Sequence, residues 1–244
     1  MNFLLLDEGE LRDGRARLRG RRARHVVEVL RGEVGRRLRA GVLDGPLGEA
    51  EIERVEPHEV VVRVELSRPS PPAPDSLLLA APRPKVLLRM LSHAAALGFG
   101  RVVIFRSWRV DKSWMQSRAF DVAVQREQLV AGLEQAGRTK LPEVLRYDLF
   151  RPMVEDALPE LGLPKLRFVA HPTAATATAA LDGVRGPFAL ALGPDGGFLD
   201  YEVERLRDVG FLPISAGPHP LRTETALAVL QGQLALLRDR RAAR

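Results

Sequence analysis

The sequence predicts an α/β protein in which a small N-terminal β-barrel precedes a larger domain built on a parallel sheet. Two observations lead to this prediction. The residues before 67 form short apolar runs broken by Gly, Asp-Gly and Pro, a pattern typical of the strands of a small barrel. After a proline-rich stretch, continuous apolar strands alternate with helical segments, which is typical of a parallel sheet covered by helices.

The composition fits a globular protein of one large or two modest domains. The chain has 244 residues, 45% of them hydrophobic, and no apolar run in the sequence approaches the roughly 20 residues that cross a bilayer. The first residues lack a basic leader and a small-residue cleavage site, so we expect a strand there and not a signal peptide. The absence of cysteine excludes disulfides, thiolate metal sites and a cysteine nucleophile, and it suits the cytoplasmic location that we expect.

The predicted barrel ends at a proline-rich linker. Its strands are expected at residues 2–6, 36–45, 48–56 and 59–66, with one helix at residues 21–31 that has Val26, Val29 and Leu30 on one face. Residues 67–76 contain four prolines, which exclude a helix or a central strand and favour an extended spacer. We therefore predict one domain over residues 1–68 and a second over residues 77–244.

The second domain begins with a strand and a helix that ends at Gly98, a residue type that commonly terminates helices. Its strands are expected at residues 77–82, 101–105, 166–172, 187–193 and 211–215. Its helices are expected at residues 83–98, 113–136, 153–161, 201–210 and 223–240. The last helix carries an apolar stripe that predicts a buried face: Ala226, Leu227, Val229, Leu230, Leu234 and Leu237.

The positive charge of the chain is concentrated near its N-terminus. Lys and Arg number 37 against 31 Asp and Glu, and residues 11–40 hold eleven Arg but only three acids. Guanidinium groups grip phosphate with paired hydrogen bonds, so this segment is a candidate RNA-docking surface. Two alternatives stay open. The excess of arginine could reflect a GC-rich genome that favours Arg throughout, and the charged segment could be an ordinary solvated helix face.

Three loops in the C-terminal third suggest a ligand site. Gly193–Gly197 (GPDGG) and Ala216–Arg222 follow apolar strands, as do His171 and Pro172, and ligands of open parallel sheets bind at the carboxyl ends of strands. The glycine spacing matches neither a dinucleotide fingerprint nor a phosphate loop. The alternative is an ordinary tight connection in which Asp200 caps the following helix.

The start of the last helix, with Arg222, Thr223, Glu224 and Thr225, is also unusual. Thr223 is a plausible N-cap, and Glu224 is the kind of acid that a helix dipole favours at this position. Capping accounts for one threonine but not for the whole set. A helix N-terminus beside an arginine is suited to anionic or polar ligand groups.

The glycine-rich loop at Gly193–Gly197 and the start of the last helix together resemble the same segments of one family. The stretch GPDGGF followed by a helix, a Gly-Phe pair and LRTETA is similar to the bacterial 16S rRNA (uracil-N3) methyltransferases of the SPOUT superfamily. Further matches are EQAGRTKLPEV at Glu134–Val144 and RHVVEVLR at Arg24–Arg31, so the resemblance covers both predicted domains. The chain departs from the family in its first catalytic-domain helix, which reads HAAALG with His93 and Ala96, in RPKV before it, and in Asp195, where the family has Glu.

The resemblance implies a PUA-like barrel followed by a SPOUT domain with a deep trefoil knot, a homodimer, and S-adenosylmethionine held by the three loops. The substrate it implies is 16S rRNA or the small ribosomal subunit. Carried onto this sequence, the cofactor-binding residues are His171, Leu192, Gly193, Pro194, Asp195, Gly196, Gly197, Ala216, Gly217, Leu221, Arg222, Thr223, Thr225 and Ala226. From the basic N-terminal segment we expect the RNA contacts to be Arg21, Arg22, Arg24, His25 and Arg31, with helix packing as the alternative for His25. The spacing of His93, His171 and His219 suits no metal site, so we expect none.

The missing thiol bears on the reaction. Methylation of a pyrimidine C5 ordinarily needs a covalent thiolate adduct, so methylation at nitrogen or oxygen remains. For uracil N3 we expect Arg222 and Arg138 to stabilise the developing negative charge, and Glu224, or secondly Asp195, to orient Arg222 or accept the proton. Two other functions stay open: methylation at another RNA position such as a ribose 2'-hydroxyl, and RNA binding without catalysis.

Overall fold

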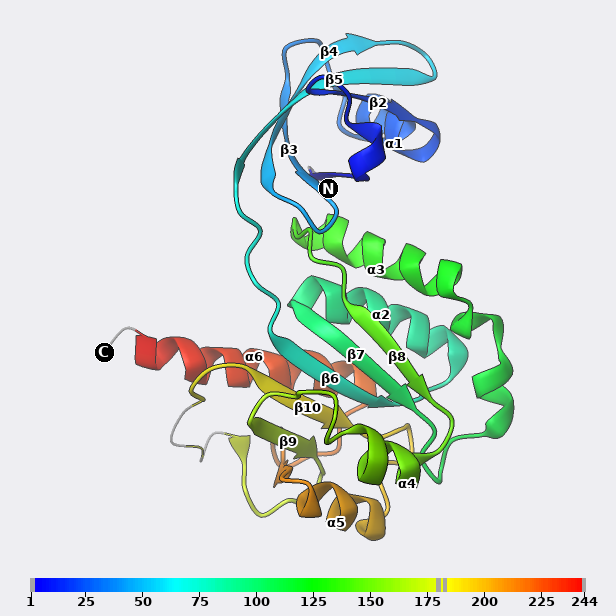
Figure 1. The fold of residues 1–244 in the computed structure, drawn as a ribbon, viewed down its shortest axis with the longest axis vertical. Helices are drawn as coiled ribbons and strands as arrows, with labels where there is room; N and C mark the ends of the chain where they lie inside the picture. Colours follow the sequence, from blue (N-terminus) through cyan, green and yellow to red (C-terminus); the bar gives the residue numbers. More distant parts are fainter. Residues whose placement is uncertain (1–2, 179–180, 182–183, 243–244) are drawn as a thin grey trace. The chain divides into compact units, whose positions relative to one another are not determined.

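The computed structural model describes residues 3–178, 181 and 184–242 (Figure 1). The chain divides into two compact units. The first unit contains residues 1–72 and 130–141, and the second contains residues 73–129 and 142–244. Residues 130–141 fall within the predicted second domain, yet they pack with the first unit.

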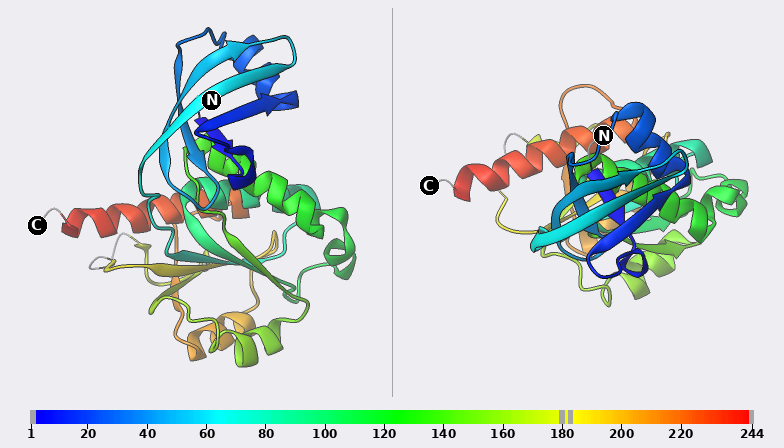
Figure 2. Two further views of the ribbon diagram at one scale, coloured as in Figure 1. Left: turned by 45° about the horizontal axis from the view of Figure 1, so that its top comes forward. Right: turned by 90° about the horizontal axis from the view of Figure 1, so that it is seen from above.

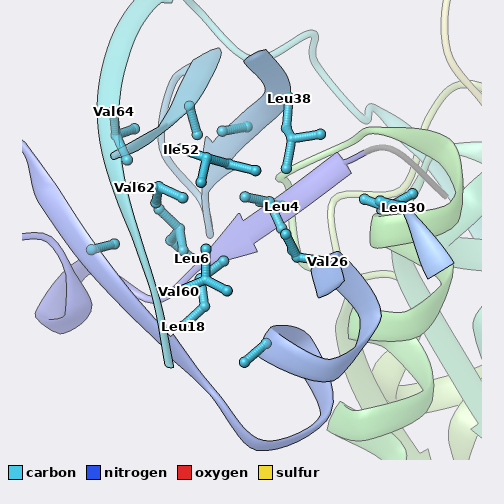
Figure 3. Close-up of a cluster of buried hydrophobic side chains, with 14 of the residues drawn as sticks. Leu4, Leu6, Leu18, Val26, Leu30, Leu38, Ile52, Val60, Val62 and Val64 are labelled. Atoms are coloured by element: carbon cyan, nitrogen blue, oxygen red, sulfur yellow. The ribbon is translucent and has the colours of Figure 1, made fainter. Parts of the chain in front are cut away.

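The first unit is a curled sheet with the strand order β1-β3-β4-β5-β2, in which β1 and β3 are parallel and the other pairs antiparallel. Its strands are β1 (Phe3–Leu6), β2 (Arg15–Arg19), β3 (Arg37–Val42), β4 (Leu47–Val55) and β5 (Glu59–Arg68). Their inward side chains pack with those of the helical segment over residues 20–29 in one apolar cluster (Figure 3). Leu18, Val26, Ile52, Val60 and Val62 are completely buried in it.

Residues 137–141 are fastened to this sheet by hydrogen bonds. The Thr139 hydroxyl lies 2.7 Å from both the Gly45 carbonyl oxygen and the Ser70 hydroxyl. The Leu141 amide donates to the Asp44 carboxylate at 2.9 Å. These contacts account for the grouping of this segment with the first unit.

The second unit is built on a six-stranded sheet with the order β11-β9-β10-β6-β7-β8, in which every described pair is parallel. Its strands are β6 (Asp75–Ala80), β7 (Phe99–Phe105), β8 (Glu143–Tyr147), β9 (Leu166–Ala170), β10 (Phe188–Leu192) and β11 (Leu212–Ile214). The central strands β6 and β10 are buried throughout, as expected for strands covered on both faces. The predicted α/β fold with a parallel sheet is therefore confirmed.

Helices cover both faces of this sheet (Figure 2). One face packs against α2 (Pro84–Leu97) and α6 (Thr223–Ala242), which also contact each other. The other face packs against α4 (Phe150–Pro152), the π-helical turn Met153–Ala157 and α5 (Asp200–Asp208). The predicted end of α2 is confirmed, since Gly98 adopts a left-handed conformation with φ +87° at the C-cap.

Several elements differ from the prediction. The expected helix over residues 113–136 begins only with α3 (Val122–Ala136), because two short 3-10 turns precede it and the Asp111 carboxylate caps the first of them at the Ser113 amide. The helix at 21–31 divides into α1 (Gly20–Arg24) and the π-helical turn His25–Val29, which leaves Val29 63% exposed and off the apolar face. The helix expected at 153–161 starts at Phe150 and ends at Ala157.

Two strands were not predicted, and each has a physical reason. In β2 the sequence RARLR alternates exposed Arg with buried Ala16 and Leu18, so its apolar side is only two residues long. The edge strand β8 is only partly buried and mixes charged with apolar residues, which weakens the pattern of a buried strand.

Candidate functional site

The carboxyl ends of three neighbouring strands form one pocket. The strands β10, β9 and β11 lie side by side and parallel, so the loops that follow them leave the same edge of the sheet. All the predicted cofactor residues except Arg222 and Thr225 line this pocket. Six other residues line the pocket but were not among the predicted cofactor-binding residues, although Pro172, His219 and Pro220 belong to the loops predicted to hold a ligand: Ala170, Pro172, Ile214, His219, Pro220 and Leu230.

The loop after β10 is a tight turn that only glycine allows at two positions. The Gly197 amide donates to the Pro194 carbonyl at 2.7 Å, and Gly197 has φ +72°. A Cβ atom on Gly193 would lie 2.9 Å from the Phe198 amide nitrogen, which is too close for the backbone as it stands. A Cβ atom on Gly197 or Gly217, both of which line the pocket, would meet no heavy atom within 4 Å.

The last helix links two of the loops. The Thr223 hydroxyl donates to the Gly193 carbonyl at 3.3 Å, and the Gln233 side-chain amide donates to the Ala216 carbonyl at 3.1 Å. Thr223 is not the N-cap that the sequence predicts, because it is the first residue of α6 and its hydroxyl contacts the neighbouring loop. Asp200 is likewise not an N-cap, because it is the first residue of α5 and the N-cap is Leu199.

Both carboxylates near the pocket pair with cations at the start and middle of α2. The Asp195 carboxylate lies 3.2 Å from Arg83 Nε, and the Glu224 carboxylate lies 3.0 Å from Arg89 Nη2. The expected orienting contact from Glu224 to Arg222 is not among the described ion pairs, because residues two positions apart at a helix start do not face each other. The Arg222 side chain is exposed and has no ion pair within the described part of the chain.

A buried glutamate that the sequence analysis did not single out braces the pocket loop. Glu202 is only 2% exposed, and its two carboxylate oxygens accept hydrogen bonds from the Trp108 amide at 2.8 Å and the Leu199 amide at 2.9 Å. The neighbouring Arg109 donates to the Gly196 carbonyl oxygen. Glu202 stands three residues after the N-cap, but that N-cap is Leu199 and not the polar residue by which a capping box is recognised in a sequence, so no local signal identified Glu202.

We expect Glu202→Gln to destabilise the fold by about 1–3 kcal/mol. The amide keeps one acceptor oxygen but turns an NH2 group toward the second backbone N–H, which is then left without a partner. Urea unfolding measures the loss as a lower midpoint at unchanged slope. Glu204→Gln on the exposed side of α5 is the matched control, and an equal midpoint for the two variants would contradict the bracing role.

The predicted RNA-binding residues lie on the first unit, and they differ in their surroundings. Arg24 and Arg31 are exposed, and Arg21 is exposed but pairs with Glu134 at 3.0 Å. Arg22 points inward, where its guanidinium donates to the Glu10 carboxylate and the Leu5 carbonyl, and this hydrogen bonding lowers the pKa of Glu10. His25 is half-buried. Among the residues predicted to bind RNA, Arg24 and Arg31 are therefore exposed without the described ion pair that Arg21 makes.

Arg138, predicted to be catalytic, belongs to the first unit, where its guanidinium donates to the Pro72 carbonyl at 3.3 Å. Within the described residues, no group of three or more His, Asp or Glu side chains could hold a metal ion. No helix in the same part of the chain is long and apolar enough to cross a membrane.

Comparison with known proteins gives consistent matches. The family model described as an RNA methyltransferase domain matches residues 69–235. Ribosomal RNA small subunit methyltransferase E of Treponema pallidum is 29% identical over 93% of this chain and 87% of that protein. A Legionella pneumophila protein, solved with the bound cofactor S-adenosylmethionine, superposes with a TM-score of 0.69 at 26% identity over 96% of each chain. The Neisseria gonorrhoeae ribosomal RNA small subunit methyltransferase E has the same fold, with a TM-score of 0.72 at 21% identity over 97% of this chain and 96% of that one.

Proposed function

The chain belongs to the RNA methyltransferase domain family, and on this premise we propose that it transfers a methyl group from S-adenosylmethionine to N3 of a uridine in 16S rRNA. The observation that carries the proposal is the single pocket formed by the loops after β9, β10 and β11. The relatives named above act on ribosomal RNA of the small subunit, and the Legionella neighbour holds S-adenosylmethionine.

The residues of the pocket fit this cofactor. Leu192, Ile214, Leu221 and Leu230 supply apolar surface for a flat ring, and the backbone of Gly193–Gly197 supplies polar groups at close range. The open space beside Gly197 and Gly217 would be filled by any other side chain. When bound, S-adenosylmethionine supplies an electrophilic methyl group on its sulfonium centre.

The chemistry at uracil N3 requires help from the protein, because this nitrogen keeps its proton in neutral water. We assign the exposed guanidinium of Arg222 to the uracil carbonyl oxygens, where negative charge develops as the proton leaves. Arg138 keeps its predicted role of stabilising this developing charge together with Arg222. Glu224 and Asp195 remain the candidate proton acceptors. Asp195 lines the pocket and pairs with Arg83, and Glu224, which directly follows the lining residue Thr223, pairs with Arg89.

We further propose the architecture that the family resemblance implies. It consists of a PUA-like RNA-binding domain over residues 1–68 and a SPOUT domain with a trefoil knot over residues 77–244. The curled sheet of the first unit and the parallel sheet of the second support this assignment. A cytoplasmic homodimer acting on 16S rRNA or the small subunit completes the proposal.

Calorimetric titration with S-adenosylmethionine tests the cofactor assignment. We expect saturable binding with one site per chain, because each chain carries all three loops of the pocket. Absence of binding would leave RNA binding without catalysis as the function of the fold.

The basic segment of the first unit gives a second test. We expect the double variant Arg24→Gln/Arg31→Gln to weaken rRNA binding and to lower the log-log salt slope by about 1.5, because each lost phosphate contact removes somewhat less than one released counterion. Binding is measured between 50 and 200 mM salt, a range over which phosphate contacts have large effects. Arg118→Gln/Arg207→Gln, which removes the same charge from exposed positions of the second unit, is the control. If the salt slope of rRNA binding is the same for Arg24→Gln/Arg31→Gln as for the wild-type protein, these arginines belong to a solvated face and do not contact phosphate.

A further inference from the structure

A second cavity of about 540 Å³ lies in the second unit and shares no lining residue with the cofactor pocket. Its walls come from the loop after β7, the start of α4 and the start of α5. This volume is typical of ligand-binding clefts. We call it the Trp108 cavity, after the most exposed aromatic residue in its wall.

The aromatic residues of this cavity are unusually accessible. Trp108 is 82% exposed and Tyr201 is 49% exposed, whereas the floor contains the buried Phe150. The backbone beneath Trp108 is nevertheless fixed, since the Val110 amide donates to the Ser107 carbonyl at 3.1 Å and the Trp108 amide donates to Glu202. An indole presented to solvent from an anchored turn is suited to stacking against a flat partner.

A polar group in the same wall lacks a partner. Ser107 is 3% exposed, and its hydroxyl makes no hydrogen bond within the described part of the chain. Buried hydroxyls are normally paired, but the Ser107 oxygen is itself shielded, so it would have to turn toward the cavity before a ligand could bond to it.

Two guanidinium groups, those of Arg106 and Arg151, lie in the wall of the cavity. Arg106 donates to the Asp148 carbonyl at 3.0 Å and Arg151 pairs with Glu155 at 2.8 Å, while the lining carboxylate, Glu202, accepts two backbone N–H groups. Guanidinium groups beside aromatic rings are typical of sites that bind single-stranded nucleic acid.

The cavity is connected to the cofactor pocket through one residue. Arg109 follows Trp108 directly, and its guanidinium donates to the Gly196 carbonyl of the pocket loop. A molecule stacked on Trp108 therefore contacts the loop after β7, whose Arg109 is hydrogen-bonded to a loop of the proposed methyl-donor site.

We propose that the Trp108 cavity binds an unstacked base of the RNA substrate, one that neighbours the methylated nucleotide. Trp108 stacks on the base and Tyr201 closes its other side. This inference rests on the proposed function, since it takes the substrate to be RNA. Splaying a base out of its stack and holding it on an aromatic side chain is a common means of single-strand recognition.

Fluorescence gives a direct readout, because the chain has only two tryptophans. In a Trp114→Phe background the emission reports Trp108 alone, and we expect a single-stranded oligouridylate to quench it saturably. Emission that depends on protein concentration without RNA would instead indicate that a second copy of the chain covers the cavity. That result, or the absence of quenching, would overturn the proposal.

Mutation separates this site from the catalytic proposal. We expect Trp108→Ala to weaken 16S rRNA binding by roughly ten-fold through the loss of one stacked base, with an unchanged salt slope, unchanged S-adenosylmethionine affinity and unchanged kcat at saturating RNA. Trp108→Phe should retain most of the affinity. Val122→Ala, which truncates a side chain that is 81% exposed and outside the cavity, is the control.

The outcomes are distinguishable. If the wild-type protein methylates rRNA but Trp108→Ala binds rRNA as tightly as Val122→Ala, only the base-binding cavity is wrong. If the wild-type protein neither binds S-adenosylmethionine nor methylates rRNA, the proposed function itself fails, whatever the quenching shows.

Discussion

Arg222→Ala is expected to reduce methyl transfer by about 10²–10³-fold while leaving the affinity for S-adenosylmethionine nearly unchanged. The Arg222 side chain is exposed and has no ion pair within the described residues, so its removal leaves no buried charge without a partner. It stands between two residues that line the pocket, Leu221 and Thr223. Because its assigned role is to stabilise charge that develops only during the reaction, the loss should fall on kcat.

Radioactive methyl transfer to 16S rRNA, measured beside calorimetry with S-adenosylmethionine, separates the two effects. Arg207→Ala, an exposed arginine of α5 outside the pocket, controls for the change in net charge. Turnover of Arg222→Ala at the wild-type rate would remove Arg222 from the mechanism. Loss of cofactor binding in the same variant would reassign it to holding the cofactor.

Gly193→Ala is expected to lower the affinity for S-adenosylmethionine by at least ten-fold. The added Cβ would lie 2.9 Å from the Phe198 nitrogen and 3.1 Å from the Gly197 carbonyl carbon, and backbone atoms cannot give way without moving the loop. The same movement would break the hydrogen bond from the Thr223 hydroxyl to the Gly193 carbonyl, which links this loop to α6.

Gly196→Ala is the matched control for this prediction. Its Cβ would lie 3.1 Å from Cδ of Arg109, a flexible side chain that can shift. Calorimetry should therefore show near wild-type affinity for Gly196→Ala and weak binding for Gly193→Ala. Equal affinities would mean that the turn geometry around Gly193 does not shape the cofactor site.

The sequence predicts the layout of the second unit well because that layout follows from local pattern. Continuous apolar strands such as Phe188–Leu192 are buried on both faces, and the glycine at 98 ends its helix in the expected left-handed conformation. Parallel strands bring their carboxyl ends to one edge, so the meeting of the three predicted loops follows from topology. The pocket accordingly contains most of the residues predicted for it.

What could not be predicted depends on contacts between distant segments. The pairing of Glu224 with Arg89 joins residues 135 positions apart, and the bracing of the Trp108 amide by Glu202 spans 94 positions. No periodicity encodes such contacts. The same holds for Arg22, which looks like a surface arginine in the sequence but is turned inward by Glu10 and the Leu5 carbonyl.

The measurement that tests the central claim most directly is a methylation map of 16S rRNA by mass spectrometry. Unmodified 16S rRNA is treated with the purified protein and S-adenosylmethionine, and rRNA from a strain that lacks the gene is mapped alongside rRNA from its parent. We predict one additional methyl group, on N3 of a single uridine, that appears with the wild-type protein and is missing from the deletion strain. A methyl group on a ribose 2'-hydroxyl, or no added methyl group, would contradict the account.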